Sequence, residues 1–430
     1  MRIDGMLHGM TILVKLRKEL KILAGEMRRY LRPALLIIIA AFGVLWYSLY
    51  GDVKVGQRHD HGWCYKLTVQ YKERFGKTLD RSERDAIRQD YAEFRQELDC
   101  VVEKYLGEYG IHSQRDYEMV CEAGLMGTDS EYYEEAVRKY GLDDLVKLYE
   151  KCAFGFPYNH PLRSLEDKEQ VYKGAMITFD FLENLDVDKY YEQERQYEDW
   201  RYRPVPESVP RMKECTASGE LSTMRAFYMP DVEIGETFGR WMMFVWIVCA
   251  ALAVPFLTRN RVSCVQGQQF ASKIGKAILF RQLGAVLLLA VLVNVIIRSV
   301  FCGLLFNGSY GLAPLLDCPI DVGRTWDAHW YDMTFLQYIL RMIVINSMIP
   351  SMVLTCALFL TTCFCKNYLT AAAAAIPTYW LIGQWFSILD FYPMFRPRLA
   401  FPLLFSATLL VVSVATALIL QWIRKRDYVI

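Results

Sequence analysis

Polar side chains inside long apolar stretches are the residues of this chain whose types and spacing could do chemistry. Asn294 and Arg298 lie four residues apart in one such stretch, and Gln337 and Arg341 repeat that spacing at the start of another. Residues four apart share one face of a helix, and a charge inside a membrane is costly and marks a functional site by default. Either pair therefore predicts the lining of a path for a polar or amphipathic substrate. The alternative, which the sequence alone favours, is that both arginines lie near helix ends and extend to the interface.

Two clusters contain residue types that bind metals. A His-Asp-His run at residues 59–61 precedes Cys64, but its spacing matches no standard zinc site, and a polar loop next to the membrane is the simpler interpretation. Cys363 and Cys365 lie at the end of an apolar stretch, where cysteines more often fill apolar space than bind a soft metal. The sequence therefore predicts no metal site.

Motifs of catalytic and nucleotide-binding sites are absent from the sequence. It contains no Gly-x-x-x-x-Gly-Lys-Ser/Thr loop, no Gly-x-Ser-x-Gly elbow and no His-Glu-x-x-His pair. We therefore expect no catalytic residue, no cofactor and no enzyme activity in this chain. Its 27 Tyr, 23 Phe and 10 Trp exclude a disordered chain, and its basic residues, scattered around apolar stretches, argue against nucleic-acid binding.

Six stretches are apolar enough, and about long enough, to cross a bilayer, which requires roughly 20 helical residues. They cover residues 34–50, 241–257, 283–302, 339–363, 369–389 and 401–423. Arg341 lies near the start of the fourth, and Gly383 with Gln384 interrupts the fifth. The sequence predicts an all-α integral membrane protein with six transmembrane helices.

Charge is unevenly distributed along the chain, with a net +5 in residues 1–50, −13 in 51–238 and +9 in 239–430. Basic residues in short loops favour the cytoplasmic side, and clusters of them flank the stretches so that both termini are expected in the cytoplasm of a multi-pass plasma-membrane protein. The predicted organisation is a basic amphipathic lead-in at 1–33, a first span at 34–50, an extracellular domain at 51–238 and a five-helix membrane domain at 239–430.

The predicted extracellular domain is mainly helical. Asp80 and Glu83 have the spacing of a capping box at a helix start, and Gly110 is a typical helix stop. Between them, apolar residues recur at spacings of three and four. This stripe, which predicts the core of a small helical domain, consists of Ile87, Tyr91, Phe94, Leu98, Val101 and Tyr105.

Six of the 12 cysteines fall on the predicted extracellular side: Cys64, Cys100, Cys121, Cys152, Cys215 and Cys318. An oxidising compartment permits disulfides among them, and the sequence leaves their pairing open. Buried thiols are the alternative.

Several segments of the membrane part carry a family pattern. Leu-Val-Lys-Leu-Arg-Lys-Glu-Leu at 13–20 precedes the first span, a basic loop with a glycine follows the second at 259–276, and a basic tail ending in aspartate follows the sixth at 422–428. These segments resemble the permease subunits of type-2 ABC transporters. Some branches of that family carry a large extracellular domain between the first two spans.

The resemblance implies a permease that moves a substrate such as a peptide, antibiotic, lipid or ion across the plasma membrane. It also implies a separate ABC ATP-binding subunit, which hydrolyses the ATP, and a second permease subunit, as a homodimer or a related chain, within membrane lipid. The residues it implies for ATPase coupling are Arg259, Arg261, Gly267, Gln268, Lys273, Lys276 and Arg281. An alternative function is a polytopic membrane sensor or scaffold whose extracellular domain binds a ligand or partner protein.

Overall fold

The computed structural model describes residues 25, 33–50, 59–157, 160–196, 209–227, 230–262, 278–307, 311–320, 333–365, 367–390 and 400–425. The chain forms two compact units. Unit 1 comprises Met1–Val53, Pro230–Leu312 and Leu336–Ile430, and unit 2 comprises Lys54–Met229 and Ala313–Phe335. Unit 2 therefore takes in a segment that lies between the third and fourth predicted spans, in addition to most of residues 51–238.

Unit 1 is built from helices at the six apolar stretches. They are α2 (Pro33–Tyr50), α12 (Pro230–Val262), α14 (Ile278–Asn307), α15 (Phe335–Arg341) with the π-helical segment η8 (Met342–Met348) and α16 (Ile349–Cys363), α17 (Tyr368–Asp390) and α18 (Ala400–Lys425). Among the described residues, four helices are long and apolar enough to cross a membrane, within α12, α14, α15–α16 and α18. The predicted helical class is thus confirmed, and these four helices suggest a membrane protein.

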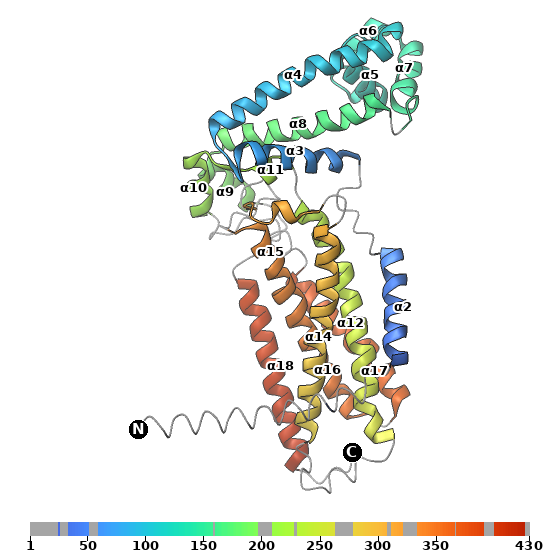
Figure 1. Cartoon of the computed structure of the whole chain (residues 1–430), viewed down its shortest axis with the longest axis vertical. Coiled ribbons are helices and arrows are strands. Elements are labelled where there is room, and N and C mark those ends of the chain that lie inside the picture. The colour runs from blue at the N-terminus through green and yellow to red at the C-terminus, as the bar shows by residue number, and fades with distance from the viewer. Residues whose placement is uncertain are drawn as a thin grey trace. The chain divides into compact units, whose positions relative to one another are not determined.

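Helix α16 packs against α12, α14, α17 and α18 (Figure 1). Leu354 and Phe359 on this helix are fully buried, as expected for the innermost helix of a bundle. Its polar side chains are satisfied locally, because Ser351 Oγ donates a hydrogen bond to the Ser347 carbonyl at 2.7 Å. Helix α16 therefore provides an apolar centre against which the other helices of unit 1 pack.

Aromatic side chains pack α2 against α12. The Trp46 and Phe244 rings are stacked at a centroid distance of 6.0 Å, and the Phe42 ring centroid lies 5.8 Å from that of Phe244. Gly43 permits this approach, because a Cβ there would lie 3.2 Å from the Phe244 ring. Such aromatic pairs stabilise helix contacts beyond the area that they bury.

Unit 2 is a helical domain with one pair of very short strands. Its helices are α3 (His59–Phe75), α4 (Arg81–Leu106), α5 (Gln114–Met126), α6 (Tyr133–Tyr140), α7 (Leu142–Phe154), α8 (Pro161–Glu183), α9 (Val187–Arg195), α10 (Val209–Ser218) and α11 (Thr223–Phe227). Strands β1 (Thr78–Leu79) and β2 (Leu221–Ser222) pair antiparallel, with Leu79 opposite Leu221. Helices α4 and α8 run side by side, and α5, α6 and α7 gather at one end of them (Figure 1).

Helix α4 begins and ends as the sequence predicts. Asp80 Oδ1 accepts a hydrogen bond from the Glu83 backbone N–H at 2.9 Å, and the Glu83 carboxylate accepts one from the Asp80 N–H at 2.8 Å. A 3₁₀ turn at Gly107–Tyr109 follows, and Gly110 closes it with a φ of 79°. This left-handed conformation favours glycine. The predicted capping box and glycine stop are confirmed.

The apolar stripe of α4 is confirmed in its first half and shifted in its second. Ile87, Phe94 and Leu98 are buried, but Val102 is fully buried in the core where Val101 was expected, and Val101 is half-buried. Val102 is four residues after Leu98, so the two side chains lie on the same face of α4, which packs against α8.

The described residues at 313–320 pack within unit 2, where their backbone accepts hydrogen bonds from side chains. Ser222 Oγ donates to the Pro319 carbonyl, and the buried Arg225 donates from Nε to the Ile320 carbonyl at 3.0 Å. Lys72 forms an ion pair with Asp317. Residues 317–320, between the third and fourth spans, therefore belong to the same folded body as α3 and α11.

Candidate functional site

The predicted pair Asn294 and Arg298 lies in the interior of unit 1. Both residues are on α14, one turn apart, and their exposed fractions are 0% and 1%. Every neighbouring turn of α14 is apolar, as its sequence from Ile278 to Asn307 shows. The alternative in which Arg298 extends to the interface is wrong, because its side chain is enclosed by the helices.

A chain of hydrogen bonds runs from Arg298 through Ser347 to Asn294. Arg298 Nε and Nη2 donate to Ser347 Oγ at 3.1 and 3.0 Å. The Ser347 hydroxyl donates to Asn294 Oδ1 at 2.8 Å, and Asn294 Nδ2 donates to the Ala290 carbonyl at 2.9 Å. Because a guanidinium can only donate, the direction of every bond in the chain is fixed. We call Asn294, Arg298 and Ser347 the buried polar cluster.

The π-helical segment η8 carries Ser347. In this segment the hydrogen bonds skip one residue more than in an α-helix, and the Ile349 N–H donates to the Val344 carbonyl. Pro350 follows immediately and has no N–H to offer the Asn346 carbonyl, which an α-helix would require. Short π-helical segments inside helices occur frequently at functional sites. The local backbone of Met342–Met348 therefore gives the Ser347 hydroxyl its place beside α14.

Aromatic side chains surround the guanidinium of Arg298. Its Cζ lies 3.7 Å from the Phe238 ring centroid and 5.8 Å from that of Phe301, and Nη1 donates to the Phe238 carbonyl at 3.5 Å. Cation–π contacts of this kind stabilise a cation away from water. No carboxylate contacts Arg298 among the described residues, so its positive charge has only dipoles and rings as partners.

Hydrogen-bond donors exceed acceptors around the buried polar cluster. Three of the five guanidinium N–H groups of Arg298 donate to Ser347 and Phe238, which leaves two without a partner among the described residues. Trp241, whose ring lies 5.5 Å from that of Phe301, also has a buried indole N–H without a partner in the described part of the chain. An anion or a strong acceptor is the group that such a set can bind.

The second predicted pair does not join this cluster. Gln337 is exposed and Arg341 is half-buried on α15, and the hydrogen bonds of Asn294, Arg298 and Ser347 include neither. The sequence missed Ser347, for which the only available signal was a polar residue just before a proline within an apolar stretch. It gave no signal for Phe238, whose ring is apolar and unremarkable in sequence.

The residues implied for ATPase coupling lie almost wholly outside the described side chains. Arg259 and Arg261 are in the last turns of α12, with backbone described only, and Arg281 is half-buried in the first turn of α14. Gly267, Gln268, Lys273 and Lys276 lie outside the described residues. Their coupling role stays a prediction.

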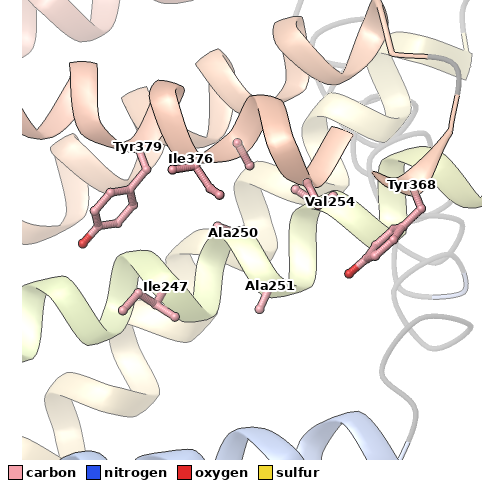
Figure 2. Close-up of a pocket in the computed structure, with 9 residues that line it drawn as sticks. Ile247, Ala250, Ala251, Val254, Tyr368, Ile376 and Tyr379 are labelled. Carbon is pink, nitrogen blue, oxygen red and sulfur yellow. The ribbon is translucent and has the colours of Figure 1, made fainter. Parts of the chain in front are cut away.

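An apolar groove of about 380 Å³ lies between α12 and α17 (Figure 2). Ile247, Ala251 and Val254 line one side, and Tyr368 and Tyr379 stand at its two ends (Figure 2). Helix α17 continues through Gly383 and Gln384, which interrupt the apolar stretch. The groove contains no residue of the buried polar cluster and offers apolar surface rather than charged groups.

The structure shows the surroundings of the cysteines expected outside and allows a search for metal-binding groups. In the described part of the chain, no three His, Cys, Asp or Glu residues are grouped to hold a metal, and the side chains at 59–61 lie outside it. Cys100 is exposed, Cys318 is buried, and Cys121 and Cys152 are a half-buried and a buried thiol within unit 2. Cys64 is half-buried on α3, and Cys215 is buried on α10.

Comparison with known proteins identifies no relative of this chain. No protein-family model matches the chain, and neither a curated protein nor a solved structure is significantly similar to it.

Proposed function

We propose that the chain is the permease subunit of an ABC-type transporter, with six membrane spans, both termini in the cytoplasm and unit 2 outside. The observation that carries the transport proposal is the buried polar cluster, in which Arg298 lies 1% exposed among apolar helices. Burying a cation without a carboxylate is costly. A chain that keeps such a residue in its apolar interior is expected to use it, and passage of a polar group is a use that fits this location.

The surplus of donors favours a substrate with an anionic group, such as the phosphate of a lipid headgroup or the carboxylate of a peptide. Two N–H groups of Arg298 have no partner among the described residues, and a planar guanidinium binds phosphate or carboxylate through paired N–H groups. The energy for movement would come from a separate ATPase subunit that pushes on the cytoplasmic segments at 10–32 and 258–281. A second permease subunit would complete the path.

Replacing the whole buried polar cluster tests the transport proposal. The triple variant Asn294→Leu, Arg298→Met, Ser347→Ala leaves no member of the cluster unpaired, and apolar replacements of buried ionic groups are often neutral or stabilising. We expect its melting temperature in detergent to be retained, while transport-coupled ATP hydrolysis by the purified complex falls by about tenfold or more, the effect of losing one charged hydrogen bond. Unchanged hydrolysis in the triple variant would contradict a role in transport.

Purification of the complex tests the partner. After gentle detergent extraction, we expect a subunit with an ATP-binding cassette to co-purify, and Gly267→Trp or Lys273→Glu to reduce its recovery without reducing membrane insertion. Lys213→Glu is the matched control, because among the described residues of unit 2 Lys213 forms only an exposed ion pair with Asp188. Recovery of only non-ATPase partners would overturn the proposal.

A sensor or scaffold is the second candidate function, and exposed apolar side chains of unit 2 favour it. Leu125 and Met126 at the end of α5, and Leu142 and Val146 one turn apart on α7, are all more than half exposed. Exposed apolar groups that gather on one region favour binding of a partner protein. The same purification separates the two functions, because a sensor would recover such a partner, and Leu142→Asp with Val146→Asp would release it.

A further inference from the structure

Cys121 and Cys152 face each other inside unit 2. Cys121 lies on α5 and Cys152 on α7, and these two helices pack together. The Cys121 thiol lies near enough to Cys152 to raise the pKa of the Cys152 thiol. Cys152 is fully buried and Cys121 is half-buried. Of the cysteines expected outside, these two thus lie at one seam between two packed helices.

The backbones of α5 and α7 approach closely at this pair. Gly124 is one turn after Cys121, and a Cβ at Gly124 would lie only 2.3 Å from the ring of Tyr149, which is one turn before Cys152. No side chain larger than glycine fits there without movement of α7. A disulfide requires Cα atoms roughly 4.4–6.8 Å apart, and a glycine at the seam allows the two helices to approach more closely than a larger residue would.

Neighbouring side chains hold the end of α7 in place. Arg163, on α8, donates to the carbonyls of Cys152, at 3.0 Å, and Ala153. The same guanidinium donates to Glu166 at 3.1 Å, and that carboxylate accepts a hydrogen bond from the Tyr117 hydroxyl at 3.0 Å. Because Tyr117 is one turn before Cys121 on α5, this network connects both helices that carry the pair. The thiols are positioned from three helices rather than placed on mobile chain ends.

We propose that Cys121 and Cys152 form a disulfide that joins α5 to α7. The half-buried Cys121 would first lose its proton and attack a disulfide of an external oxidant, such as oxidised glutathione, which releases one thiol and leaves a mixed disulfide on Cys121. Cys152 then loses its proton and attacks the Cys121 sulfur, which releases the second thiol. Two protein thiols are oxidised and one external disulfide is reduced to two thiols, so electrons and protons balance.

The order of the two steps follows from burial. The neighbouring Cys121 thiol and burial both raise the pKa of the Cys152 thiol, which therefore stays protonated. Because the thiolate is the attacking species, the half-buried Cys121 is the residue that an external disulfide reaches first. Formation of this bond in cells rests on the extracellular location of unit 2 in the proposed function.

Peptide mapping without reduction tests the pair directly. Trypsin would release Cys121 in the peptide 116–138 and Cys152 in the peptide 152–163, so the disulfide appears as one species that contains both. We expect this species from the full-length protein after thiols are blocked in denaturant, and its loss after reduction. In Cys152→Ser it should disappear and Cys121 should become alkylated, whereas Cys100→Ser, which changes an exposed cysteine, should leave it intact.

Two further experiments distinguish failure of the disulfide proposal from failure of the proposed extracellular location of unit 2. Labelling of Cys100 in intact cells by a membrane-impermeant maleimide tests the location of unit 2, and absence of labelling would overturn the proposed topology. Incubation of membranes with oxidised glutathione tests the pair irrespective of compartment, and we expect the joined peptide there. Two alkylated thiols at Cys121 and Cys152 after that incubation would overturn the disulfide.

Discussion

Ser347 is the residue that turns two polar side chains of α14 into a connected cluster. Its hydroxyl accepts both Arg298 bonds and donates to Asn294. Without it, two N–H groups of a buried cation and one amide oxygen lose their partner together. A buried group left without a hydrogen bond destabilises a protein by about 1–3 kcal/mol, and more when the group is charged.

The variant Ser347→Ala measures that contribution. We expect the free energy of unfolding to fall by about 2–3 kcal/mol. Among the described residues, Arg298 then keeps only the Phe238 carbonyl and the rings of Phe238 and Phe301 as partners. The measurement is the melting temperature of the full-length protein in detergent. Ser299→Ala is the control, since Ser299 is exposed on the same helix. Equal melting temperatures for the two variants would show that the cluster does not stabilise the fold.

The residue pattern alone located two of the three residues of this cluster. The spacing of Asn294 and Arg298 placed both on one face of one helix, and the structure buries that face. Ser347 is 53 positions away from Asn294 and is oriented by π-helical backbone. No periodicity rule for α-helices predicts where a side chain in such a segment points, so its partnership with Arg298 could not be derived from sequence.

At the scale of elements, local signals predicted boundaries well. The capping box at Asp80 and the stop at Gly110 depend on side-chain and backbone chemistry within a few residues, and both are found. The place of the segment 313–335 in unit 2 depends instead on the carbonyls of Pro319 and Ile320. Every residue has a backbone carbonyl, so nothing in the sequence distinguished these two.

The cap of α4 makes the stability of its first turn dependent on pH. Hydrogen bonds from the Glu83 backbone N–H and then from the Ser82 hydroxyl lower the pKa of Asp80 below its usual value. A carboxyl group whose pKa is lowered by folding stabilises the folded state above its unfolded pKa, and this contribution is lost as the pH falls through the folded pKa. The window for Asp80 therefore lies below about pH 4.

Hydrogen exchange at residues 81–86 of the full-length protein measures this effect. At neutral pH we expect Asp80→Ala to exchange faster than wild type in these amides, because the cap is lost. Asp80→Asn keeps an acceptor that does not titrate and should exchange nearly as wild type does. Below about pH 4 the wild type should lose protection relative to Asp80→Asn at the same pH. A constant ratio between these two across the pH range would contradict titration of the cap.

At the scale of the whole molecule, the apolar stretches of the sequence predicted the helical class and the apolar bundle. Whether the chain crosses the membrane six times depends on two helices, α2 and α17. Among the described residues, α12, α14, α15–α16 and α18 meet the criteria of length and apolarity. Helices α2 and α17 are present at the predicted positions but are not among these four. Six crossings with unit 2 outside require α2 and α17 to span the membrane as well.

Labelling on both sides of α17 decides whether it crosses. In a Cys100→Ser background, six spans place a cysteine at Tyr368 on the cytoplasmic side and one at Arg398 outside, because basic clusters fix the remaining loops inside. We expect Arg398→Cys to react with a membrane-impermeant maleimide in intact cells, and Tyr368→Cys, whose parent side chain is half exposed, to react only after permeabilisation. If α17 does not cross, the two positions share one side and label under the same condition. Such a result would leave at most five crossings. With five crossings the two termini lie on opposite sides of the membrane, so the basic segments before the first span and after the sixth could not both be cytoplasmic.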